Sequence, residues 1–105
     1  MDPPDAIVGA PDGAALGVLS AARDAGRSVG DDLLVASCVD SLAMQLVTPA
    51  VTAIDLRPRE IGFDSANVLL RLIEGEDLPQ LVRRARPPLE LRQSTSRSVA
   101  AASFV

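Results

Sequence analysis

Two short, nearly continuous apolar runs mark the first part of the chain, at residues 5–10 and 33–39. Apolar runs of this length, without polar alternation, are typical of parallel strands that are covered on both faces. Between them lies a helical pattern with two adjacent apolar stripes, the first formed by Leu16 and Leu19 and the second by Ala15, Val18, Ala22 and Ala25. The pattern therefore predicts a strand–helix–strand unit with a right-handed crossover.

The ends of this helix are marked by residues that favour helix termini. Asp12 occupies a natural N-cap position, Gly13 follows at the helix start, and Gly26 provides the stop. Gly9, Gly13 and Gly17 are spaced for close contact between helix and strand. We therefore expect the helix to begin after Asp12 and to pack closely on the sheet.

The second half of the chain predicts one further strand, one long helix and two short extended segments. Residues 51–54 form the strand, and Pro58 fits the first turn of an amphipathic helix that ends at Gly75. One face of this helix carries Gly62, Ala66, Leu69 and Ile73. The two extended segments are residues 81–82 and 89–91.

The amino-acid composition indicates which kind of core and which kind of surface to expect. The chain has 105 residues, of which 48% are hydrophobic, and its two aromatic residues are Phe63 and Phe104. The core is therefore expected to be aliphatic and rich in alanine. A net charge of −4 argues against a surface that binds nucleic acid. The basic cluster of Arg83, Arg84 and Arg86 is interpreted as a solvated or interdomain surface.

The chain offers few residues for catalysis or metal binding. It has no histidine, and Cys38 is its single cysteine, so an intrachain disulfide and a transition-metal site are not expected. Cys38 is interpreted as a small hydrophobe in the core. No phosphate-binding glycine loop is present. We therefore expect no catalytic residue, no metal and no cofactor, and a small α/β enzyme is the least favoured alternative.

The ends of the chain and its apolar runs bear on localisation. The start, Met-Asp-Pro-Pro-Asp, has neither the basic region nor the apolar region of a signal peptide. No apolar run approaches the length that spans a membrane. We expect a cytoplasmic protein without contact to membranes.

Three patterns in fixed order add a family resemblance. They are the run from Asp5 to Ser20, the segment Val47 to Ile54 followed by Arg59-Glu-Ile-Gly62 and Leu69-Leu-Arg-Leu-Ile-Glu-Gly75, and Pro87-Pro-Leu-Glu-Leu-Arg-Gln-Ser-Thr95. Together they resemble the C-terminal part of the effector-sensing core of LacI/GalR-type transcription regulators. The resemblance spans residues 5–95 and leaves residues 96–105 as a flexible tail.

The resemblance implies a partial periplasmic-binding-protein-like fold, a doubly wound parallel α/β fold that is a fragment of a two-lobed domain. The strand–helix–strand unit at residues 5–39 is then expected in the C-terminal lobe, and residues 52–54 in a crossover. The helix at residues 58–74 is expected on the N-terminal lobe, with residues 89–94 returning from it.

The same resemblance points to candidate effector contacts. Family members carry Asn-Asp after the first strand, where this chain has Pro11-Asp12, and two acidic residues after the second strand, where it has Val39-Asp40. Asp12 and Asp40 remain as candidate effector-binding residues, with a helix cap and a turn as their alternative roles. Either the effector is less polar than a sugar, or no small-molecule effector is bound.

The family's first helix also implies a dimer contact, through the leucine that matches Leu16, and we include Ala15 and Leu19 with it. We expect self-association as a homodimer or higher oligomer, with exchange of segments between protomers as one form. No helix-turn-helix pattern is present, so direct binding to nucleic acid is not expected. A fragment of a solute-binding protein of the same fold is the alternative.

Overall fold

The computed structural model of the chain describes residues 2–79 and 84–97. These residues form two compact units, residues 2–55 with 88–97 and residues 56–79 with 84–87. The chain thus leaves the first unit after Asp55 and returns to it at Pro88. Both positions lie close to the crossovers that the sequence predicts.

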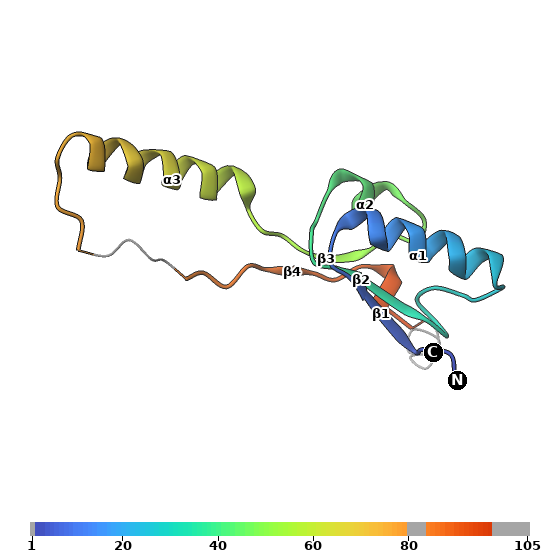
Figure 1. Cartoon of the computed structure of the whole chain (residues 1–105). Helices are drawn as coiled ribbons and strands as arrows, with labels where there is room; N and C mark the ends of the chain where they lie inside the picture. Colours follow the sequence, from blue (N-terminus) through green and yellow to red (C-terminus); the bar gives the residue numbers. More distant parts are fainter. Residues whose placement is uncertain (1, 80–83, 98–105) are drawn as a thin grey trace, which may run out of the picture. The chain divides into compact units, whose positions relative to one another are not determined.

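The first unit is built on a four-stranded sheet. Its strands are β1 (Ala6–Gly9), β2 (Leu34–Ser37), β3 (Thr52–Ile54) and β4 (Leu89–Glu90), in that spatial order. The pairs β1–β2 and β2–β3 are parallel, while β4 runs antiparallel to β3 (Figure 1). The predicted strand–helix–strand unit and the third strand are confirmed, because α1 (Asp12–Asp24) connects β1 to β2.

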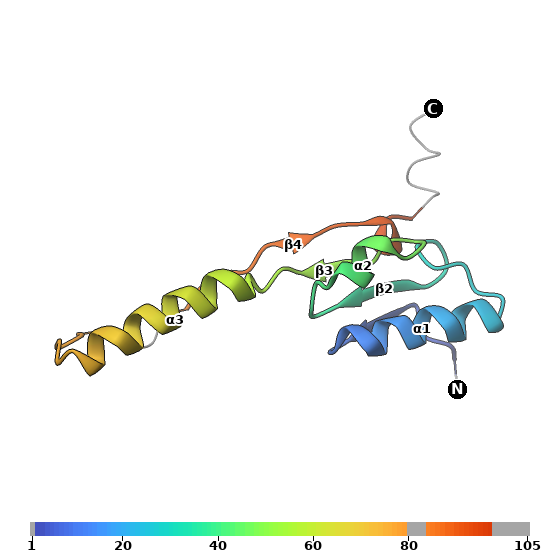
Figure 2. The same cartoon turned by 90° about the horizontal axis from the view of Figure 1, so that it is seen from above.

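The core of this unit lies between the sheet and α1. Figure 2 shows α1 and the short helix α2 (Leu42–Leu46) beside the strands. The buried hydrophobic side chains are aliphatic or Met, as the composition predicts: Ala15, Leu19, Ala22, Leu33, Val35, Met44, Val51 and Ala53. The alanines of α1 allow the helix backbone to approach the strands. Sequence analysis missed α2, whose five residues are too few for a helical repeat to be recognised.

Gly9 shows why the contact between α1 and β1 is close. A Cβ atom at this position would lie 2.9 Å from the backbone nitrogen of Ala15. The predicted close approach is therefore confirmed at Gly9, whereas a Cβ at Gly13 or Gly17 would meet nothing within 4 Å. Those two glycines lie on parts of α1 that face away from the strand.

Two further expectations need correction. The helix α1 begins one residue earlier than predicted, with Pro11 at the N-cap and Asp12 as the first helical residue. In addition, β1 is not covered on both faces, since Val8 is 66% exposed. The apolar run at residues 5–10 was interpreted as a parallel strand covered on both faces. Among the described residues, however, β1 pairs only with β2 and lies at the sheet edge.

The second unit contains α3 (Pro58–Ile73), which begins with the predicted proline and is followed by Gly75. None of its residues is buried, so its predicted apolar face is exposed within the described part of the chain. Val68 is half-buried and lines a groove of about 670 Å³ together with Ile61, Arg84 and Arg86. The predicted extended segment at residues 81–82 lies outside the described residues, as do residues 98–105 of the expected tail.

The first unit ends in a short 3-10 helix, η1 (Gln93–Thr95), which follows β4. Ser94 of η1 is fully buried, and its hydroxyl accepts a hydrogen bond from the Thr52 backbone nitrogen at 2.8 Å. The same hydroxyl donates to the backbone oxygen of Val35 at 2.5 Å. These bonds fasten η1 to both β2 and β3.

Candidate functional site

The carboxyl ends of the parallel strands β1, β2 and β3 lie at the same edge of the sheet. In open α/β sheets this is the edge at which ligands bind. Pro11 and Asp12 follow β1, Val39 and Asp40 follow β2, and Asp55 follows β3. We call these five residues the strand-end edge.

Asp12 is a helix-terminal carboxylate in this structure. It is half-buried, and its Oδ1 accepts a hydrogen bond from the backbone nitrogen of Gly13 at 2.9 Å. An acidic side chain in the first turn also interacts favourably with the positive end of the helix dipole. The predicted helix-end role of Asp12 is thus observed at the first helical position rather than at the N-cap, and its role in effector binding stays a prediction.

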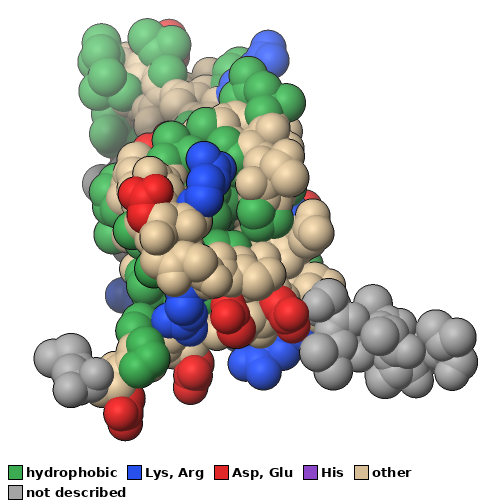
Figure 3. Space-filling model, turned by 90° about the vertical axis from the view of Figure 1, so that its right-hand side faces the viewer, with side chains coloured by type: hydrophobic (Ala, Val, Ile, Leu, Met, Phe, Trp, Pro, Cys, Tyr) green, Lys and Arg blue, Asp and Glu red, His purple; other side chains and the backbone are tan. Residues whose placement is uncertain are grey.

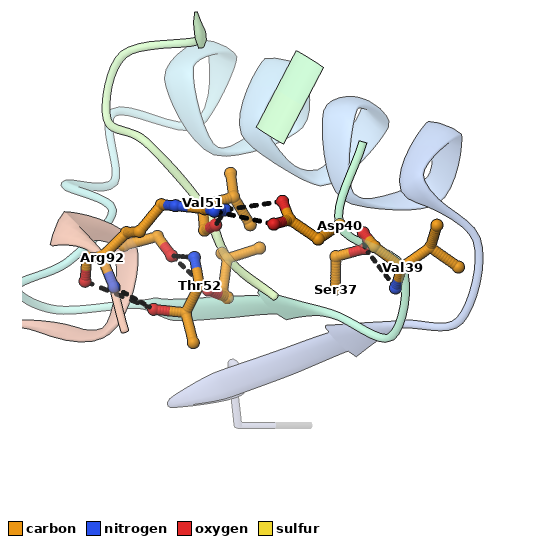
Figure 4. A network of polar contacts seen from close by, with 8 residues as sticks. Ser37, Val39, Asp40, Val51, Thr52 and Arg92 are labelled. Carbon is orange, nitrogen blue, oxygen red and sulfur yellow. Dashed lines mark hydrogen bonds and ion pairs between the residues drawn. The ribbon is translucent and has the colours of Figure 1, made fainter. Parts of the chain in front are cut away.

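Asp40 is held by a residue that sequence analysis did not select. The Arg92 guanidinium donates from Nη1 to Asp40 Oδ1 and from Nη2 to Asp40 Oδ2, both at 2.8 Å (Figure 4). The Asp40 side chain is 8% exposed and the Arg92 side chain 17%. The backbone nitrogen of Asp40 also donates to the oxygen of Ile54 at 3.0 Å. Both carboxylate oxygens of Asp40 are therefore engaged within the chain.

The contact between Arg92 and Asp40 shifts the pKa of both residues. The hydrogen bonds from Arg92, with the charge of its guanidinium, hold the pKa of Asp40 below its usual value, while burial opposes them. The same hydrogen bonds raise the pKa of Arg92, again against burial, and the charges of Asp40 and Glu90 act in the same direction. Both members are therefore charged at neutral pH.

Arg92 also contacts the chain around the start of β3. Its Nη1 donates to the backbone oxygen of Val51 at 2.7 Å, and its backbone nitrogen donates to Thr52 Oγ1 at 2.8 Å (Figure 4). Thr52 Oγ1 lies 2.5 Å from Thr95 Oγ1, within hydrogen-bond distance. In the sequence, Arg92 was visible only as part of the resemblance at residues 87–95. A single arginine gives no local indication of a partner 52 positions earlier in the chain.

The turn between β2 and Asp40 is held by Ser37. Its hydroxyl donates to the Val39 backbone oxygen at 2.7 Å and accepts from the Val39 backbone nitrogen at 3.1 Å. Val39 therefore stands in a fixed turn at the edge. Next to Asp40, the Ser41 hydroxyl is buried without a hydrogen-bond partner among the described residues.

The three predicted dimer-contact residues lie in different environments. Ala15 is 0% and Leu19 8% exposed, and both belong to the core of the first unit. Their side chains pack on the chain's own sheet and offer little surface to a partner, so a dimer contact through them stays a prediction that their burial does not favour. Leu16 is 36% exposed on the other side of α1.

Cys38 needs a further correction. It is a free cysteine with a half-exposed position at the end of β2, rather than a fully buried core residue. The described residues contain no group of three or more side chains that could hold a metal ion. Within residues 2–79 and 84–97, no helix is long and apolar enough to cross a bilayer.

The distribution of charge does not form a basic face on the surface shown in Figure 3. Acidic and basic side chains lie next to one another in its lower part, and hydrophobic side chains gather above them. Interspersed charges of both signs do not concentrate the positive potential that phosphate backbones require. This agrees with the net charge of −4.

Comparison with known proteins places this arrangement among binding-protein-like domains. The sequence pattern of the "Periplasmic binding protein-like domain" family matches residues 1–95. The NTD biosynthesis operon regulator NtdR of Bacillus subtilis is 32% identical over 95 residues, which cover 90% of this chain and 29% of that protein. The lactose operon repressor of Rhizobium radiobacter is 32% identical over 74 residues, covering 70% of this chain and 66% of the repressor.

Solved structures agree with the sequence matches. A LacI family transcriptional regulator from Bifidobacterium animalis subsp. lactis superposes with a TM-score of 0.85 and 34% identity, covering 92% of this chain and 36% of that chain. The lac repressor dimer bound to operator and the anti-inducer ONPF superposes with a TM-score of 0.78 and 30% identity. The match covers 89% of this chain and 28% of that chain. The chain spans between 22% and 66% of the length of the curated relatives it matches.

Proposed function

The chain belongs to the periplasmic binding protein-like domain family, in the group formed by LacI-type transcription regulators, and we propose that it is an effector-sensing and self-associating module of such a regulator. In this proposal the module works in the cytoplasm, performs no catalysis and does not itself contact DNA. The observation that carries the proposal is the strand-end edge, where three parallel strands end together on a fold shared with these regulators.

The side chains of the strand-end edge favour a particular kind of effector. Pro11 has no side-chain donor or acceptor, Val39 is apolar, and both oxygens of Asp40 are engaged by Arg92. A site that hydrogen-bonds sugar hydroxyls loses about 1–3 kcal/mol for each buried polar group left unpaired. We therefore propose an effector less polar than a sugar.

Self-association is supported by the apolar surface that the chain exposes. Leu42 and Leu46 of α2 are 66% and 71% exposed, and Leu16 of the neighbouring α1 is 36% exposed. Exposed apolar patches of this kind are typical of contact surfaces. One solved relative is a dimer, the lac repressor bound to operator. We propose that Leu16, rather than Ala15 or Leu19, contacts the partner.

The first test is the mass of the full chain in solution, measured by light scattering after size-exclusion chromatography at several concentrations. The proposal predicts a dimer or a larger discrete oligomer. A folded monomer at all concentrations would contradict self-association.

The second test addresses the strand-end edge with lactose as the probe. The double variant Pro11→Asn, Val39→Asp introduces the side chains that other family members carry. We expect lactose to raise the melting temperature of this variant but not of the wild-type chain, because a ligand stabilises only the state that binds it. The matched control is Pro3→Asn, Val29→Asp, which introduces the same residue types away from the edge. No effect in the double variant would contradict the assignment of the edge.

A further inference from the structure

Arg92 joins segments that are distant in the sequence. Its guanidinium binds the Asp40 carboxylate after β2 and the Val51 oxygen before β3, and its backbone binds the Thr52 hydroxyl within β3. A residue in the returning segment 88–95 is thus bonded both to the strand-end edge, at Asp40, and to the start of β3. Such a set of contacts fixes the position of the segment as well as contributing to stability.

The backbone pairing of this segment is too short to fix it alone. β4 has two residues, and its register with β3 consists of the pairs Ala53–Glu90 and Ile54–Leu89. Both residues of β4 are exposed. A two-residue strand gains little from packing. Two further backbone bonds flank β4, from the Asp55 nitrogen to the Pro88 oxygen at 2.9 Å and from the Ser94 nitrogen to the Ala50 oxygen at 3.0 Å. Arg92 adds the side-chain bonds that lie nearest to β4 in the sequence.

A second arginine–carboxylate pair in the chain shows what is particular about this one. Arg71 binds Glu76 through two hydrogen bonds of 3.1 and 3.2 Å, but these side chains are 49% and 46% exposed. The bonds between Arg92 and Asp40 are shorter, at 2.8 Å, and their side chains are 17% and 8% exposed. Exposed pairs contribute little, whereas a buried fork-shaped pair defines geometry.

We propose that Arg92 is a positioning residue that clasps the returning segment 88–95 to the strand-end edge, and that Asp40 is its counter-ion rather than an effector contact. The clasp couples two events. Release of the segment at Arg92 frees the Asp40 carboxylate at the edge, and capture of Asp40 by another group removes the attachment that Arg92 provides, while the bonds of Ser94 remain. This gives the edge a defined connection to the segment through which the chain returns from residues 56–87.

The first experiment measures amide hydrogen exchange by mass spectrometry in the full chain. In Arg92→Gln and in Asp40→Asn, exchange in peptides covering residues 88–97 should accelerate by about tenfold or more, because a hydrogen bond to a charged group is lost. Exchange in α1 should stay within about twofold. Arg71→Gln is the control, since it removes an exposed arginine–carboxylate pair that is also joined by two hydrogen bonds, and it should leave exchange in residues 88–97 unchanged.

Two outcomes of this experiment would overturn the proposal. The first is unchanged exchange in residues 88–97. The second is equal acceleration in α1 and in residues 88–97, because the pair would then support the whole unit without positioning the segment. Arg92→Lys keeps the charge but lacks the planar fork that binds each carboxylate oxygen through its own nitrogen. In this variant, residues 88–97 should be better protected from exchange than in Arg92→Gln but less protected than in wild type. Protection equal to wild type would contradict the clasp geometry.

A pH profile separates positioning by the charged pair from simple packing. Because the pKa of Asp40 is lowered in the folded chain, protection of residues 88–97 should be complete at neutral pH. It should be lost as the pH falls below about 4 and through the lowered pKa. Among the described residues, Glu90 is the other charged group that acts on Arg92. After correction for the intrinsic exchange rate, Asp40→Asn should show no such loss, and a loss identical to wild type would overturn the proposal.

The inference depends on the proposed function only for the name given to the edge. A monomeric wild-type chain, or an absence of lactose binding in the Pro11, Val39 variant, would remove the proposed function and leave the clasp intact. Conversely, unchanged exchange in Arg92→Gln would remove the clasp without affecting the mass of the oligomer. The two failures are therefore distinguishable.

Discussion

At the scale of single residues, the most constrained positions are those where the backbone conformation or a buried polar group permits only one residue type. Gly30 has a φ of 94°, a conformation that favours glycine. A Cβ atom at this position would lie 2.5 Å from the backbone oxygen of Gln93. The loop before β2 therefore approaches η1 so closely that a side chain cannot be accommodated without movement of the backbone.

Replacement of Gly30 by Ala should lower the free energy of unfolding by about 1–3 kcal/mol from the backbone conformation alone, and further from the contact with Gln93. Urea denaturation followed by circular dichroism measures the change. Gly17→Ala is the control, because a Cβ there meets nothing within 4 Å. Because position 17 lies in the middle of α1, Gly17→Ala should instead raise the free energy of unfolding by about 0.5–1 kcal/mol. Equal effects of the two variants would contradict this account.

The site residues show what sequence reasoning can and cannot find at this scale. Asp12 and Asp40 were identifiable because they match acidic positions that the family carries after its first and second strands. Arg92 was not, since its role comes from partners more than 40 positions earlier in the chain, at Asp40 and Val51. Ser94 was missed for the same reason, because its partners Val35 and Thr52 belong to two different strands.

At the scale of elements, the two short helices contribute in different ways. α1 buries three residues against the sheet, whereas α2 buries only Met44, which is 0% exposed. Leu46 of the same helix is 71% exposed. A five-residue helix cannot persist alone, so α2 depends on Met44 reaching the core.

Met44→Ala should therefore lower the free energy of unfolding by about 2–5 kcal/mol, the usual range for truncating a large buried side chain. Leu46→Ala, on the same helix, should change the free energy of unfolding by less than about 0.5 kcal/mol. The measurement is again urea denaturation of the full chain. A small effect of Met44→Ala would mean that the core does not extend to α2.

The exposed side of α1 supports a prediction about assembly. Leu16→Glu should convert the oligomer to a monomer, since a charge buried in an apolar contact is costly. Ala21→Glu places the same charge on another exposed part of α1 and should leave the mass unchanged. Light scattering of both variants decides the matter. If Leu16→Glu keeps the wild-type mass, the partner contact lies elsewhere.

At the scale of the whole molecule, the chain combines a small core with a large exposed apolar surface. Large apolar side chains that are at least half exposed occur in both units, among them Val8, Leu42, Ile61, Phe63 and Ile73. The hydrophobic content of 48% therefore exceeds what the described core buries. Association with further protein is the expected way to cover such a surface.

Charge at this scale leads to a separate prediction about DNA. With a net charge of −4 and interspersed signs, the chain should not bind a random-sequence DNA duplex at an ionic strength of about 0.15 M. Fluorescence anisotropy of a labelled duplex, titrated with the full chain, measures this. A rise in anisotropy that disappears at high salt would show a basic surface that the composition does not reveal, and would contradict the proposal that the module leaves DNA contact to other parts of a regulator.

The sequence by itself determined the local elements and the family. Apolar runs, helix stops at Gly26 and Gly75, and Pro58 at a helix start depend on neighbours within a few positions, so they are readable from the chain. The order of the three motifs along the chain was sufficient for the resemblance, and the family match over residues 1–95 agrees with it.

Tertiary structure alone decided which residues share a site and which apolar faces are covered. The clasp of Arg92 on Asp40, the burial of Ala15 and Leu19 within the chain, and the exposure of Val8 and α3 all depend on packing between distant segments. An amphipathic pattern shows that a face needs a partner, but it does not say whether that partner lies in the same chain. This physical limit explains why the elements could be predicted from the sequence, whereas the partners of their apolar faces could not.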